Sequence, residues 1–117
     1  MDLMVKHLAE TEKNRITNKQ AKNAFMKVLV SEKEGWDDYV MRVVEVDKDG
    51  FTPKHQHPWP HINYVIEGKG DIMIEGENHS VKAGSYAFVP NDALHQYRNT
   101  GDQVFKFICI VPKHGHH

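Results

Sequence analysis

The sequence has a single cysteine, no long apolar run and no segment with the period of a long helix. Cys109, the lone cysteine, has no second thiol in the chain with which to form a disulfide. No run approaches the roughly 20 apolar residues that cross a bilayer as a helix, and residues 1–13 lack the apolar core of a signal peptide. We therefore expect one small soluble domain in the cytoplasm, without membrane attachment.

The charge is nearly balanced, with 15 Lys and Arg against 16 Asp and Glu. Proteins that track nucleic-acid phosphates usually carry a basic stripe or patch. None is apparent here, so nucleic acid is not expected as a partner.

Short segments rich in β-branched and aromatic residues dominate the chain after residue 24 and alternate with turn signals such as Asp49-Gly50 and Thr100-Gly101-Asp102. This pattern is typical of an all-β antiparallel sandwich or barrel. We expect an N-terminal arm over residues 1–24, a barrel over 25–112 and a C-terminal tail over 113–117. The expected strands cover residues 25–30, 39–46, 62–67, 71–75, 86–89, 95–99 and 104–111.

Alternation along the strands indicates which side chains share a face. Phe107 and Cys109 are expected on one face of the last strand. Between residues 40 and 46, Arg42 interrupts a face that is otherwise valine. A charge on such a face needs a partner or water. Arg42 therefore either lines a wet pocket or extends from the rim of a strand to solvent.

The nine histidines are clustered. His55 and His57 are spaced to share a face of an extended chain, and both rings can then reach one ion. His61 follows two prolines that stiffen the connection, and His95 begins a later strand. His114, His116 and His117 end the chain. We favour a flexible tail for these three, with a second metal site as the alternative.

These two histidine blocks resemble the two motifs of the cupin superfamily. In the first, His55-Gln56-His57 matches, and His61 stands where the family usually has glutamate. In the second, His95 matches, while Asp92 replaces an expected glycine. The other matching positions are Gly50, which is one residue too close to His55, and Gly68, Gly84, Pro90 and Asn99, which are correctly spaced.

The resemblance implies a cupin-type double-stranded β-helix, or jelly-roll, barrel. It is closest to small single-domain cupins with four histidines that are associated with manganese, which implies a divalent metal on His55, His57, His61 and His95. By ligand softness alone, Fe, Ni, Cu or Zn also suit imidazole. We take four side chains as candidate substrate-binding residues, with plain core packing as the alternative for the last three: Arg42, Tyr97, Phe107 and Cys109.

Two classes of function remain. One is a metal-dependent enzyme acting on a small organic substrate at an open site, either oxidative and dioxygenase-like or a sugar-acid isomerase or ring-opening enzyme. The other is a non-catalytic module that binds a small molecule or sugar.

Because free imidazoles have a pKa near 6.5, metal binding is expected to weaken below about pH 6. A homodimer is expected, with its face on the strands that contain Val28 and Val30, and Ile108 and Ile110.

Overall fold

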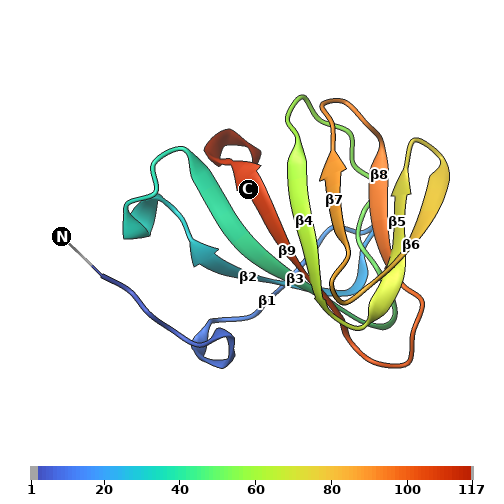
Figure 1. Cartoon of the computed structure of the whole chain (residues 1–117), viewed down its shortest axis with the longest axis horizontal. Helices are drawn as coiled ribbons and strands as arrows, with labels where there is room; N and C mark the ends of the chain where they lie inside the picture. Colours follow the sequence, from blue (N-terminus) through green and yellow to red (C-terminus); the bar gives the residue numbers. More distant parts are fainter. Residues whose placement is uncertain (1–2, 117) are drawn as a thin grey trace.

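The computed structural model describes residues 3–116 and shows an antiparallel β-barrel that is nearly closed (Figure 1). The strands follow the order β6-β5-β8-β3-β9-β4-β7, with β2 paired to β3 and β1 paired to β2. This confirms the expected all-β jelly-roll class. The strands are β1 Asn14–Arg15, β2 Lys22–Val30, β3 Tyr39–Phe51, β4 His61–Glu67, β5 Lys69–Ile74, β6 Glu77–Lys82, β7 Tyr86–Val89, β8 His95–Asn99 and β9 Phe105–Pro112.

Three short 3-10 turns complete the described elements: η1 Leu8–Glu10, η2 Glu32–Glu34 and η3 Lys113–Gly115. Within residues 3–116, no helix has the length and apolar composition needed to cross a membrane.

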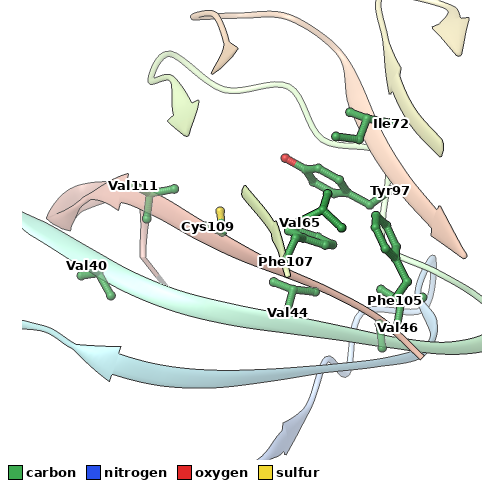
Figure 2. Close-up of a cluster of buried hydrophobic side chains, with 11 residues drawn as sticks. Val40, Val44, Val46, Val65, Ile72, Tyr97, Phe105, Phe107, Cys109 and Val111 are labelled. Atoms are coloured by element: carbon green, nitrogen blue, oxygen red, sulfur yellow. The ribbon is translucent and has the colours of Figure 1, made fainter. Parts of the chain in front are cut away.

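The core forms where alternating side chains from several strands meet inside the barrel. In β9, every second residue is buried, and Phe105 and Phe107 are almost fully enclosed. Figure 2 shows these rings beside Tyr97, with valines of β3 beneath them. The expected shared face of Phe107 and Cys109 is confirmed by this pattern.

Gly68 occupies a position that only glycine fits. Its φ is +78°, and a Cβ there would lie 2.2 Å from the carbonyl oxygen of Val104. Side chains avoid both the left-handed backbone and such a contact. The motif glycine is thus explained by the tight passage from β4 to β5.

Two expectations for local structure are wrong. The sequence pattern predicted no strand between residues 76 and 85, but β6 forms there, paired along its length with β5. Its residues are almost all polar and exposed, so no alternation marks it. Asp49-Gly50 was expected to be a turn, yet β3 continues through it to Phe51.

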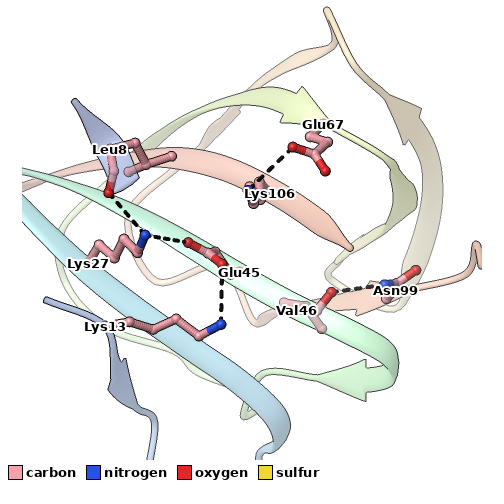
Figure 3. A network of polar contacts seen from close by, with 8 residues as sticks. All are labelled: Leu8, Lys13, Lys27, Glu45, Val46, Glu67, Asn99 and Lys106. Carbon is pink, nitrogen blue, oxygen red and sulfur yellow. Dashed lines mark hydrogen bonds and ion pairs between the residues drawn. The ribbon is translucent and has the colours of Figure 1, made fainter. Parts of the chain in front are cut away.

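The N-terminal arm is attached to the outer face of β2 and β3. Lys27 donates to the carbonyl oxygen of Leu8 at 3.0 Å. Glu45, buried on the same face, forms ion pairs with Lys27 at 3.4 Å and with Lys13 at 3.6 Å (Figure 3). From there, the chain passes through β1 at the edge of β2.

Candidate metal centre

Four histidines meet at one end of the barrel because three separate segments present them there. His61 is the first residue of β4 and His95 is the first residue of β8. The backbones of His55 and His95 exchange two hydrogen bonds of 2.9 Å. His57 follows two residues later, as the strand-like spacing predicted.

Asp92 holds the loop that carries His57. Its amide donates to the carbonyl oxygen of His57 at 2.8 Å, and its own carbonyl accepts from the Gln56 side chain at 2.8 Å. The φ of Asp92 is +64°, a left-handed conformation that aspartate tolerates better than most residues. This explains how aspartate serves at the motif position where glycine was expected.

The ring nitrogens converge. Nitrogen atoms of His55, His57 and His95 all lie within 4.8 Å of one another, a grouping that could hold a metal ion. His61 lies outside that mutual grouping but adjoins two of its members. Its Nε2 is 3.1 Å from Nε2 of His57, and its ring centroid is 4.8 Å from that of His95.

Backbone carbonyls orient two of these rings. Nδ1 of His95 lies 2.9 Å from the carbonyl oxygen of Ala93, and Nδ1 of His57 lies 3.4 Å from that of Trp59. A carbonyl only accepts, so in these contacts Nδ1 carries the proton and Nε2 keeps a free lone pair. Such outer contacts are usual for metal-binding imidazoles.

Partial desolvation favours the neutral form of all four imidazoles, although only His61 and His95 are buried, His57 is half-buried and His55 is exposed. This desolvation is the main cause that lowers the pKa of His55, His57 and His95 below the ordinary value of 6.5. The pKa of His61 falls to about 2, because of burial first and then the neighbouring His95 and His57. Neutral imidazole is the form that binds metal.

The donor set fits a divalent transition metal. Two ligand nitrogens at about 2.1 Å from an ion, with roughly 90° between the bonds, lie about 3.0 Å apart. The 3.1 Å between Nε2 of His57 and Nε2 of His61 matches this separation. Neutral imidazoles suit Zn, Cu, Fe and Ni by softness.

The histidines open into a cavity of about 680 Å³ inside the barrel. The structure places all four candidate substrate-binding residues in its wall. Tyr97 stacks on Phe107 with 4.4 Å between ring centroids, and its hydroxyl donates to Asn63 Oδ1 at 2.6 Å. Arg42 Nη2 lies 3.2 Å from Cys109 Sγ. Burial raises the pKa of Tyr97 well above its ordinary value, so its hydroxyl stays protonated.

Several wall residues were not found from the sequence. Met26 and Val28 of β2 face the cavity beside Val44 and Arg42 of the neighbouring strand β3, and residues 14–18 of the arm also line it. The alternation in β2 could have indicated Met26 and Val28. The side chain of Val28 lines this cavity, whereas a dimer formed through the strand that contains Val28 and Val30 stays a prediction.

The described part of the C-terminal tail is folded, which corrects the expectation of a flexible tail. Residues 113–115 form η3, and Gly115 is buried so close to Trp59 that a Cβ would lie 2.5 Å from its Nε1. His114 packs edge-on against Trp59 at 5.4 Å between centroids. His117 lies outside the described residues. The grouping of metal-type ligands includes neither His114 nor His116.

A family model described as "Cupin domain" matches residues 42–111. The polyketide synthase CurC of Streptomyces cyaneus is 32% identical over 65 residues, which cover 51% of this chain and 42% of that protein. A glucose-6-phosphate isomerase of Thermococcus kodakarensis is 34% identical over 98 residues, covering 74% of this chain and 52% of that protein. This chain thus spans about half the length of these two relatives.

Among solved structures, the polyketide cyclase RemF of Streptomyces resistomycificus superposes with a TM-score of 0.89 at 25% identity. The match covers 96% of this chain and 80% of RemF.

Proposed function

The chain belongs to the cupin family, and we propose that it is a metal-dependent enzyme that acts on a small organic substrate at the histidine cluster. The observation that carries the proposal is the convergence of four neutral imidazoles on one side of a 680 Å³ cavity. A purely structural metal would need no such cavity. We take His55, His57, His61 and His95 as the ligands and manganese, by family resemblance, as the metal.

The reaction we favour is oxidation of the dioxygenase type, in which both atoms of O2 enter the substrate and no separate reductant is consumed. A divalent ion held by these four neutral ligands would keep its charge of +2 and would supply a strong Lewis acid. Around it, Tyr97 holds its proton and offers a fixed polar group through its contact with Asn63. Phe107 gives an apolar wall.

A second candidate is isomerisation or ring opening of a sugar acid or sugar phosphate. The relative that favours it is the glucose-6-phosphate isomerase, over about half of that protein's length. A non-catalytic small-molecule-binding role is the third outcome. The relative CurC and the neighbour RemF carry names from polyketide synthesis. These names support a small organic molecule as the ligand of this chain, whichever of the three functions it has.

One experiment separates the three. The full chain, loaded with Mn²⁺ or Fe²⁺, is incubated with diketones, phenols, alkenes and uronates while O2 uptake and product mass are followed. O2 consumption with a product heavier by two oxygen atoms supports the oxidative reaction. A product of unchanged mass supports isomerisation, and binding without product supports the binding module.

We also propose a homodimer. The outer face of β4 and β7 exposes five large apolar side chains: Ile62, Tyr64, Ile66, Tyr86 and Phe88. Tyr86 is 82% exposed, Phe88 62% and Tyr64 47%, so these three aromatics alone leave roughly 400 Å² in contact with water. A standard interface buries about 800 Å² on each partner. The three aromatics alone supply about half of that area.

The register extends this face across β9. Ile110 pairs with Ile62, which pairs with Phe88, and Ile108 pairs with Tyr64 in the next row. A second copy presenting the same face would bury two self-complementary apolar rows, as an isologous dimer requires.

With a free, buried Cys109, we place the protein in a reducing compartment, the cytoplasm.

A further inference from the structure

Arg42 is a buried charge on the inner face of β3. It pairs with Val28 of β2 and with Cys109 of β9, and only 7% of its surface is exposed. Its side chain lines the same cavity as the four histidines. The alternative from the sequence, a side chain that reaches solvent at a strand rim, is therefore wrong.

The guanidinium group lacks an anionic partner. Within residues 3–116 it forms no ion pair, and its Nε is buried without a hydrogen bond. Nη2 reaches only the sulfur of Cys109, at 3.2 Å, and a thiol is a weak acceptor. A buried charge without a counter-ion is costly.

Glu45 shows how the same strand treats a buried charge that has only a structural role. It lies three residues from Arg42, on the opposite face, and two lysines pair with it. The fold thus supplies counter-charges on the outside of β3 and leaves the charge on the inside unpaired.

The cavity as a whole favours a negative ligand. Among the described residues that line it, none is Asp or Glu, whereas Arg42 brings a buried guanidinium to its wall. The exposed Arg15 also borders the cavity, but its guanidinium lies over the ring of Phe25. A cationic ligand would find no counter-charge there, and an anion would meet at least one buried guanidinium.

Carboxylate fits this arrangement better than phosphate. The guanidinium fork matches the oxygens of carboxylate and phosphate alike, so the surrounding wall decides between them, because a phosphate has a further oxygen that needs donors of its own. The wall near Arg42 is apolar, with Met26, Val28, Val44 and Phe107. A ligand there needs one anionic end and an apolar body.

The histidines lie one side chain away. Cys109 Sγ is 3.2 Å from Arg42 Nη2 and 3.5 Å from Nδ1 of His61. A carboxylate held by Arg42 therefore places the next atoms of a small molecule towards the imidazole cluster.

We propose that Arg42 anchors the carboxylate of the cavity's ligand, and that the substrate class is an organic acid with an apolar body. The proposal deepens the proposed function and rests on it for the reacting end of the substrate. The anchoring itself involves only residues of this chain, so it can be measured with and without metal.

The test uses the Nε–Hε signals of arginine in ¹H–¹⁵N NMR spectra of the full chain. The sequence contains three arginines, Arg15, Arg42 and Arg98, so each signal can be assigned by substitution. Benzoate is titrated as the probe, benzamide as its neutral counterpart and inorganic phosphate as the alternative anion. Each titration is run on chelator-treated protein and again after loading with Zn²⁺, which is diamagnetic.

We expect benzoate to shift the Arg42 signal saturably in both forms, and benzamide and phosphate to leave it in place. Arg42→Met should weaken benzoate binding about tenfold or more, as expected when a hydrogen-bonded charge is lost. Arg42→Lys should bind with intermediate affinity, because it keeps the charge and loses the fork. Arg98→Met removes the same charge from outside the cavity wall and should bind like the wild type.

An unmoved Arg42 signal, equal binding of benzamide, or a shift with phosphate alone would overturn the proposal. If Arg42→Met fails to fold, the shift of the wild-type Arg42 signal and the benzoate affinity of Arg42→Lys still test the proposal. Failure of the metal-centre proposal gives a different pattern, in which benzoate still binds Arg42 but Zn²⁺ does not bind the histidines.

Discussion

Nε2 of His57 and Nε2 of His61 lie 3.1 Å apart, on imidazole rings whose planes differ by 11°. Because Nδ1 of His57 faces the Trp59 carbonyl, Nε2 of His57 carries the lone pair. In the metal-free chain this lone pair accepts a hydrogen bond from a neutral His61 that is protonated on Nε2, so no added proton is needed. A divalent cation would replace that proton and bind both nitrogens.

The first prediction concerns His61, which replaces the glutamate usual in the cupin motif. His61→Glu should retain the metal but lower the net charge of the site from +2 to +1, so binding of azide to the metal should weaken. His61→Ala should bind the metal less tightly because a ligand is lost. The measurement is a titration of each variant with Mn²⁺ or Zn²⁺ and then with azide. Identical metal and azide affinities in all three proteins would show that His61 is not a ligand.

The second prediction is a pH dependence of the metal-free chain. The folded-state pKa values of the four histidines lie below the ordinary 6.5, so the unfolded chain binds more protons as the pH falls below 6.5. The free energy of unfolding should be constant above that pH with respect to these groups. Below it, stability should decrease by at most about 1.4 kcal/mol per pH unit for each imidazole.

Urea unfolding between pH 4.5 and 8 measures this slope. His61→Gln should flatten it, whereas replacing the exposed His79 by Gln should not. A stability that rises on acidification through this range would contradict the burial of neutral imidazoles. The same burial moves proton competition with the metal to a lower pH than the value near 6 expected for free imidazoles.

The third prediction separates backbone strain from steric contact at two glycines. Gly68 and Gly76 have similar φ angles, +78° and +81°, but only at Gly68 would a Cβ meet other atoms. Gly76→Ala should cost about 1–2 kcal/mol of stability from strain alone. Gly68→Ala should cost clearly more, because the Val104 carbonyl must move. If chemical unfolding gives equal losses of unfolding free energy for the two variants, the Val104 carbonyl does not obstruct a Cβ at position 68.

The fourth prediction tests the dimer face. Wild-type protein at micromolar concentration should scatter light with a mass near twice the 13.5 kDa of one chain. Replacing Tyr86 and Phe88 by Lys should give monomers, because two charges would enter the centre of the apolar face. Lys at the exposed position 79 of β6 serves as the control and should leave the dimer intact. A wild-type mass of one chain would contradict the proposal.

The sequence was informative wherever spacing alone determines geometry. Strand alternation placed Phe107 and Cys109 on one inner face, and the motif spacing brought His55 and His95 to the same end of the barrel. Both results depend on local periodicity and on short turns, which the chain itself encodes.

Features that depend on contacts between distant segments were not predictable. The polar strand β6 exists because β5 offers a partner. The C-terminal turn is ordered because Gly115 packs on Trp59. The two interpretations of Arg42 could be separated only when β2 and β9 were seen to enclose it.

The central claim is tested most directly by the metal content of the full chain, measured by elemental analysis after reconstitution with Mn²⁺ and removal of excess ion. Because the terminal histidines could bind metal adventitiously, a variant with alanine at positions 114, 116 and 117 is measured in parallel with His55→Ala/His57→Ala. We predict about one ion per chain in the wild type and in the tail variant, and none in the double variant. A wild-type chain that takes up no metal, or a double variant that retains it, would contradict the assignment of the histidine cluster as a metal centre.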